Sequence, residues 1–168
     1  MANIKIIIKV KNFGTMTAEL YPDKAPNTVA NFVKLAKENF FDGLIFHRVI
    51  RGFMIQGGGY DETMTDKDTA SIKGEFKANG FMQNDLKHTR GVLSMARTSD
   101  PNSASSQFFI MHQDAPHLDA QYAGFGKLTD GFDVLDAIAS VKTGMYGWYM
   151  QDVPKEPVVI ETIEVVEE

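Results

Sequence analysis

Residues 46–58, FHRVIRGFMIQGG, are the most informative segment of the chain. Its second half, FMIQ, alternates between two faces with a period of two, which predicts a short β-strand. Gly52 marks a turn before this strand, and Gly57 begins a glycine run that marks a turn after it. We therefore expect a pocket that is apolar on one side and carries the Arg48 guanidinium and the Gln56 amide on the other.

Three further motifs follow in order: HTRGVLSMAR at 88–97, SSQFFI at 105–110 and HLDAQYAGFGKL at 117–128. Together with residues 46–58 they resemble the cyclophilin family of peptidyl-prolyl cis-trans isomerases, in its bacterial form. The resemblance covers residues 4–166, nearly the whole chain. It implies an enzyme without a cofactor that accelerates rotation about X–Pro bonds in peptides and unfolded proteins, and so assists folding.

Length and composition fit one soluble domain spanning residues 1–168. The net charge of −5 argues against a general binder of nucleic acid or anionic membranes, because both favour a basic surface. The chain has no cysteine, so neither disulfides nor thiol chemistry are expected. The N-terminal segment alternates isoleucine with lysine, which predicts a strand rather than a signal peptide. No apolar run is long enough for a spanning helix, and we expect a cytoplasmic protein.

Apolar periodicity predicts many short strands and two helices. A hairpin is expected over 4–21, further strands over 91–97, 106–110, 125–128 and 158–166, one helix opening at Pro26 and ending before Asp42, and a second helix capped by Thr129 or Asp130. Loops are expected over 59–80, with 71–76 its most ordered part, and over 98–105 and 141–156.

This pattern indicates a mainly β barrel or sandwich with helices at its ends. The resemblance implies a closed eight-stranded antiparallel β-barrel capped by two α-helices. Because the interior of such a small barrel is filled with side chains, the site is expected on the outer surface. Phe108 and Phe109 must point to opposite faces of their strand, so one can belong to the core and the other to a pocket.

The X–Pro bond is a tertiary amide with a rotation barrier of roughly 18–20 kcal/mol. Rotation needs no nucleophile, metal or proton transfer, so neither a cofactor nor a metal ion is expected. As the bond twists, the prolyl nitrogen regains its lone pair, and a donor aimed at that nitrogen stabilises the twisted state. A guanidinium suits this role because it stays charged and its donors are fixed.

The resemblance assigns positions in the site to eleven residues, His117 among them. Arg48 corresponds to the catalytic arginine, Phe53, Met54, Phe109 and Leu118 to the proline pocket, Gln56 to the amide that fixes the substrate backbone, and Ala96, Arg97 and Gln107 to the groove for residues before proline. Tyr122 stands where many relatives carry His, and it can still form a pocket wall.

The chain departs from the animal relatives at two of these positions. His117 stands where several of them have Trp, a residue associated with cyclosporin contact, so weak cyclosporin binding is expected. Arg97 stands where those relatives have Asn, which adds a charge beside the groove. Proline-containing peptides and unfolded proteins are the expected partners, and the protein is expected to be a monomer.

Other interpretations stay open beside the isomerase. The same fold could serve as a module that binds Pro-containing segments without turnover, or as a general chaperone. The four histidines show no metal-ligand spacing, and no G-x-S-x-G motif indicates a hydrolase. His47 is expected to be a packed, hydrogen-bonded core residue. The aromatic side chains of residues 141–156, including Trp148, are expected to fold back on the barrel; a contact patch is the alternative.

Overall fold

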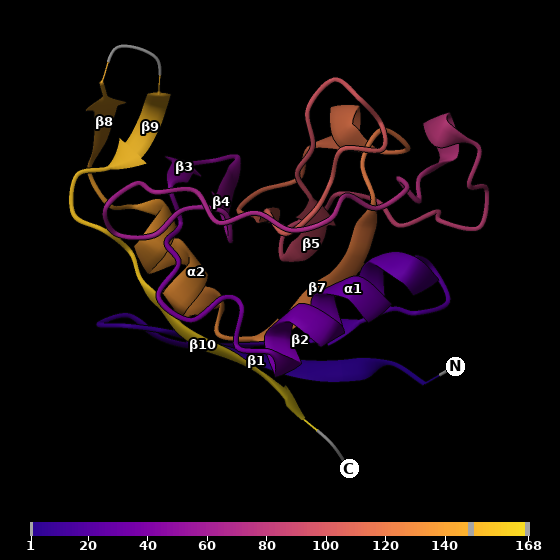
Figure 1. The fold of residues 1–168 in the computed structure, drawn as a ribbon, viewed down its shortest axis with the longest axis horizontal. Coiled ribbons are helices and arrows are strands. Elements are labelled where there is room, and N and C mark those ends of the chain that lie inside the picture. The colour runs from indigo at the N-terminus through magenta and orange to yellow at the C-terminus, as the bar shows by residue number, and fades with distance from the viewer. Residues whose placement is uncertain (1, 148–149, 167–168) are drawn as a thin grey trace.

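The computed structural model describes residues 2–147 and 150–166 (Figure 1). Eight strands form one curled antiparallel sheet in the spatial order β10-β1-β2-β7-β5-β6-β4-β3. The strands are β1 (Ile4–Val10), β2 (Gly14–Leu20), β3 (Arg48–Ile50), β4 (Met54–Gly57), β5 (Val92–Met95), β6 (Phe108–Met111), β7 (Gly124–Asp130) and β10 (Ile160–Val166). The helices are α1 (Pro26–Lys37), which packs against β10, and α2 (Phe132–Ala139), which packs against β2, β3 and β4.

The two outer strands of this sheet, β10 and β3, do not pair along a continuous ladder. The chain just before β3 makes the closing contact instead. There the Phe46 N–H donates to the Val158 carbonyl at 3.0 Å, and the Ile160 N–H donates to the Leu44 carbonyl at 2.7 Å. The predicted eight-stranded antiparallel fold with two helices is therefore confirmed, but only a short bridge closes the barrel.

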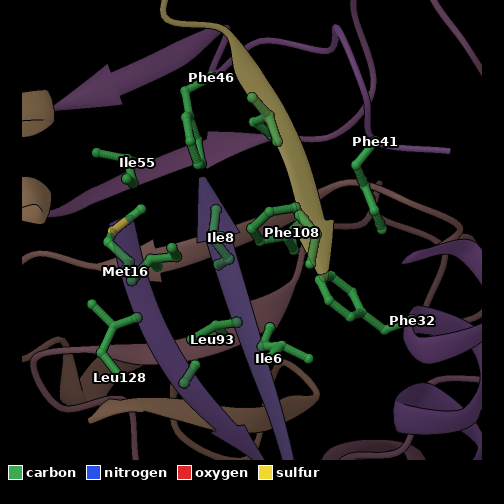
Figure 2. Close-up of a cluster of buried hydrophobic side chains, with 14 of the residues drawn as sticks. Ile6, Ile8, Met16, Phe32, Phe41, Phe46, Ile55, Leu93, Phe108 and Leu128 are labelled. Atoms are coloured by element: carbon green, nitrogen blue, oxygen red, sulfur yellow. The ribbon is translucent and has the colours of Figure 1, made fainter. Parts of the chain in front are cut away.

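The interior of the curled sheet is filled by apolar side chains (Figure 2). In β1, Ile6 and Ile8 are fully buried, whereas Lys5 and Lys9, on either side of them, are exposed or partly exposed, as the alternation predicted. From α1, Phe32 enters the same core and meets the ring of Phe108 edge-on at 5.2 Å between centroids. Because the interior is packed, the outer face of the sheet is where a ligand can bind.

The start of the second helix and the conformation of residues 71–76 differ from the sequence prediction. The second helix begins after Gly131, at which φ is +87°, so glycine rather than a capping side chain precedes it, and Thr129 and Asp130 belong to β7. Residues 71–76 form no regular element; a 3₁₀ turn follows them at Lys77–Asn79. A second 3₁₀ turn lies at Pro116–Leu118.

The predicted loop over 141–156 is instead a separate two-stranded sheet, with β8 (Thr143–Tyr146) paired to β9 (Met150–Pro154). β9 lies beside β3. The expectation that the apolar side chains here fold back on the barrel is wrong for Met145 and Tyr146, which are 56% and 44% exposed. Trp148, for which burial was also expected, lies outside the described residues.

Candidate active site

Four neighbouring strands place one row of side chains across the outer face of the sheet. In the pairing of β3 with β4, Arg48 lies directly opposite Gln56. Gln56 in turn lies opposite Phe109 of β6, and Phe109 lies opposite Ser94 of β5. Because cross-strand partners share a face, the register alone brings the guanidinium, the amide and the aromatic ring together.

A surface pocket of about 120 Å³ opens along this row. Nine of the eleven residues predicted from the sequence line it: Arg48, Phe53, Met54, Gln56, Ala96, Arg97, Phe109, Leu118 and Tyr122. Met54, Phe109 and Leu118 belong to an apolar cluster separate from the barrel core, with Phe53 packed against it. The volume is well below the roughly 300–1,000 Å³ of pockets for drug-sized ligands. The pocket therefore suits one apolar ring.

A row of hydrogen-bonded polar side chains forms one edge of the pocket. Nη1 of Arg48 donates to Oε1 of Gln56 at 3.3 Å, and Nε2 of Gln56 donates to Oε1 of Gln107 at 3.0 Å. Arg48 is exposed, and across residues 2–147 and 150–166 its guanidinium has no further hydrogen bond or ion pair. Its remaining donors can therefore turn toward a ligand in the pocket.

The tenth predicted residue, Gln107, lines an adjoining pocket of about 150 Å³. This second pocket shares Gln56, Ala96 and Arg97 with the first, so the two form one continuous groove. The eleventh residue, His117, lines neither pocket. It is exposed and its ring stacks on Phe53 with 5.9 Å between centroids, so it borders the pocket through that contact.

Arg97 is held much more firmly than Arg48. Its Nη2 and Nε donate to the Gln121 carbonyl at 2.8 and 3.3 Å, and its Nη1 donates to the Thr98 carbonyl at 2.9 Å. The guanidinium also lies 4.7 Å from the Tyr122 ring centroid and 5.0 Å from that of Phe76. The positive charge of Arg97, which the sequence predicted beside the groove, is therefore fixed in the wall of the groove by these contacts.

Sequence reasoning missed the polar groups that support the pocket from behind. The His88 ring stacks on Phe109 at 6.0 Å, and its Nε2 lies 2.8 Å from Oγ of Ser94. Its Nδ1 lies 3.3 Å from a carboxylate oxygen of Asp119. Burial lowers the pKa of His88, although Asp119 opposes the shift. This Ser–His–Asp chain is no hydrolytic site, because Ser94 is fully buried.

The sequence held one sign of this hydrogen-bonded support. Side chains alternate between the two faces of a strand, so Ser94, the one hydroxyl residue of β5, lies on the same face as the pocket.

His47 lies beside the catalytic candidate and is buried, as expected. It packs against the Tyr60 ring at 4.7 Å, but its Nδ1 has no hydrogen-bond partner among the described residues, so the expected hydrogen bond is missing at this atom. Burial, with a smaller contribution from Arg48, lowers the pKa of His47 to about 4. His47 and Arg48 also line a pocket of about 300 Å³ against β9.

Comparisons with known proteins show the family to which the chain belongs. Residues 5–165 match the family model described as cyclophilin type peptidyl-prolyl cis-trans isomerase/CLD. A peptidyl-prolyl cis-trans isomerase of Acinetobacter baylyi is 48% identical, over 98% of this chain and 87% of that protein. Peptidyl-prolyl cis-trans isomerase B of Escherichia coli is 47% identical, over 93% of this chain and 96% of that protein.

Solved structures show the same fold. A cyclophilin-type peptidyl-prolyl cis-trans isomerase of Cryptosporidium parvum superposes with a TM-score of 0.82 at 28% identity, and 99% of each chain is covered. The same protein in the presence of the dipeptide Ala-Pro gives a TM-score of 0.80 at 29% identity, over 98% of this chain and 99% of that one.

Fold and site thus define a β-barrel protein with a small apolar pocket and a guanidinium on its outer face. The chain belongs to the cyclophilin-type peptidyl-prolyl cis-trans isomerases, and it is an isomerase of X–Pro peptide bonds. No helix within the described residues has the length and apolar character needed to cross a membrane.

Proposed function

We propose that Arg48 is the catalytic residue of the isomerase and that the pocket beside it receives the proline ring. The observation that carries this assignment is a guanidinium with free donors at the edge of a small apolar pocket, oriented by a single amide, Gln56. Phe53, Met54, Phe109 and Leu118 would surround the ring, and Tyr122 would close one wall.

The chemistry follows from the charge that develops as the bond twists. In the planar amide the nitrogen lone pair is delocalised into the carbonyl group, whereas in the twisted state it is localised on nitrogen. A hydrogen bond from Arg48 to that nitrogen therefore stabilises the transition state more than the substrate, which is what lowers the barrier. The apolar pocket excludes water from the nitrogen, and the lower local dielectric strengthens this interaction.

The groove that continues from the pocket would hold the residues before proline. Gln56 and Gln107 are hydrogen-bonded to each other and can offer their remaining amide groups to a peptide backbone, while Ala96 and Arg97 form the adjoining wall. Proline-containing peptides and unfolded chains are therefore the proposed substrates. The C. parvum structure in the presence of Ala-Pro supports this substrate class.

Four broader expectations are proposed with the function: residues 1–168 form one domain, the protein is a monomer, it works in the cytoplasm, and it binds cyclosporin weakly. Sedimentation tests whether the protein is a monomer, and cell fractionation tests whether it works in the cytoplasm. A sedimenting dimer, or enrichment in the membrane or periplasmic fraction, would contradict them. Limited proteolysis that leaves one stable fragment of nearly full length supports the first.

The decisive experiment is NMR exchange between the cis and trans signals of a short Ala-Pro peptide with wild-type protein and Arg48→Ala. We expect the mutant rate to fall by roughly 10²–10³, the usual scale for one preorganised transition-state donor. Arg51→Ala is the matched control, because it removes the same charge from an exposed side chain of the same segment. An Arg48→Ala protein that is folded and keeps more than half the wild-type rate would refute the assignment.

A further inference from the structure

The turn that presents Phe53 to the pocket has its own hydrogen bond, from the Phe53 N–H to the Ile50 carbonyl at 3.0 Å, and it is also held by His112, which follows strand β6. The Gly52 N–H donates to Nδ1 of the His112 ring at 2.8 Å. The His112 backbone N–H donates to the Phe53 carbonyl at 2.8 Å. These two hydrogen bonds fix the N–H of Gly52 and the carbonyl of Phe53. They therefore restrict the backbone angles that set the direction of the Phe53 side chain.

The first of these bonds depends on the protonation state of the imidazole. Because Nδ1 accepts from Gly52, it carries no proton, and the ring proton must lie on Nε2. Nε2 lies 3.0 Å from a carboxylate oxygen of Asp136 on α2, which accepts a hydrogen bond from the Nε2–H and so fixes the tautomer.

Asp136 is itself held in place by a bidentate pair with Arg90, at 2.7 and 2.9 Å. Arg90 also donates to the His112 carbonyl at 3.1 Å. The guanidinium, with a smaller contribution from His112, lowers the pKa of Asp136, so the acceptor stays ionised. The hydrogen bonds therefore run without a break from helix α2 to the edge of the pocket.

We propose that His112, oriented by Asp136, is a positioning residue for the isomerisation, which acts by holding Phe53 in the orientation that binds the proline ring. This inference rests on the proposed assignment of Phe53 to the proline pocket. His112 does not touch the substrate; it lies behind the turn and is largely buried.

His112 can affect the orientation of Phe53 because the turn that carries Phe53 is flexible at Gly52. Gly52 has a φ of +80° and no side chain to restrict it, so without the His112 acceptor its peptide is held less firmly, although the Phe53 N–H still donates to the Ile50 carbonyl at 3.0 Å. Phe53 is only half-buried. On its outer side its ring stacks on the exposed ring of His117. Loss of the Gly52 hydrogen bond would therefore loosen Phe53, while Arg48 and Phe109, which are anchored in strands, stay in place.

The kinetic signature follows from what Phe53 does. It contacts the proline ring in the planar and in the twisted state alike, so loosening it weakens the binding of both, which raises KM and leaves kcat nearly unchanged. For His112→Leu we expect KM to rise about five- to tenfold, the effect of one lost hydrogen bond. His112→Asn can place an amide oxygen where Nδ1 lies and should restore KM to within about twofold.

The matched control is Gln113→Ala, which changes the exposed neighbouring side chain and should leave KM and kcat unaltered. A double-mutant cycle with Phe53→Ala tests the route: in that background, His112→Leu should have no further effect on KM. If His112→Leu fails to fold, Asp136→Asn replaces it. That variant should raise KM in the same way, and ¹⁵N NMR of the His112 ring should report loss of the single Nε2–H tautomer.

The outcomes separate the two assignments. A folded His112→Leu with unchanged KM, while Phe53→Ala raises KM, overturns the positioning role and leaves the pocket intact. Equal losses for His112→Leu and His112→Asn overturn it as well, because the Gly52 bond would then not be the cause. An unchanged KM for Phe53→Ala would instead refute the assignment of Phe53 to the pocket.

Discussion

Strand β6 places one phenylalanine in the barrel core and the next one in the surface pocket. Phe108 points inward, is fully buried and packs against Phe32, Phe41 and Phe46 with centroids 5.2 to 6.0 Å apart. Phe109 points outward and lies between His88 and Tyr122 at the floor of the pocket. The inner ring contributes packing, and the outer ring, at the next position of the chain, offers a surface to a ligand.

The difference extends to polar groups. Among the buried polar side chains, His88, Ser94 and His112 support the pocket side, while Thr28 of α1 pairs with Glu75 away from it. A pocket that stays open to solvent cannot hold its own walls by packing on every side. Directed hydrogen bonds between side chains and turns supply the missing rigidity there. The predictions below test this division between packing inside and directed bonds outside.

The largest effect is expected inside the barrel. Phe108→Ala should destabilise the protein by about 3–5 kcal/mol, because it leaves a cavity among rings that cannot close around it. Phe109→Ala should cost clearly less stability, since that ring already borders an open pocket, but it should abolish most of the isomerase activity. Urea unfolding and peptide exchange measure the two quantities. A greater loss of stability for Phe109→Ala than for Phe108→Ala would contradict the division.

Acid should act through buried histidines. His47 has its pKa lowered from 6.5 to about 4 by burial, so between these two pH values the unfolded chain holds more protons on this group than the folded one. Stability therefore falls as the pH drops through this window and levels off below it, by up to about 3 kcal/mol from this residue. His88 contributes with the same sign. Unfolding by urea at several pH values gives the slope.

The control for this prediction is His47→Gln, which cannot titrate. The variant should lose less stability than the wild type between pH 7 and pH 4, although its stability at neutral pH is lower. Parallel stability curves for the two proteins would show that His47 is not responsible.

The two arginines of the groove predict a smaller contrast. Arg97 is fixed by backbone carbonyls and two rings, so it shapes the wall and offers few free donors. Arg97→Ala should raise KM by about three- to tenfold with little change in kcat, as expected for the loss of contacts made equally in both states. Arg97→Lys should not restore KM, because an ammonium cannot reproduce the planar fork. A large fall in kcat would mean that Arg97 acts in the transition state.

Periodicity predicted a mainly β barrel or sandwich with two helices, and the family resemblance implied the eight-stranded antiparallel barrel. The alternation in β1 and the helical spacing after Pro26 each describe one buried face, and the structure has both. The closing bridge could not be predicted, because it rests on a few backbone hydrogen bonds of a segment too short for a sequence pattern. The hairpin of β8 and β9 was missed because its apolar residues are partly exposed and show no clean alternation.

The pocket residues could be named because motifs of four separate segments carry them. Their supports could not, because the partners lie far apart in sequence: Gly52 bonds His112, and His112 meets Asp136. Nothing in the residues around a histidine tells which of its nitrogens will face a turn and which a carboxylate. Only the register of β4 against β6 and the docking of α2 bring these groups together.

The smallest expected effect is at the rim, where His117 stacks on Phe53. Cyclosporin should bind this protein more weakly than relatives with Trp at this position, because imidazole offers a smaller and more polar face than indole. His117→Trp should tighten binding by about two- to tenfold, the scale of one added aromatic contact. Calorimetry with His117→Ala as control separates a specific gain from the mere removal of His117. Unchanged or weaker binding for His117→Trp would mean that this rim position does not contact the drug, and that the inner pocket alone determines its affinity.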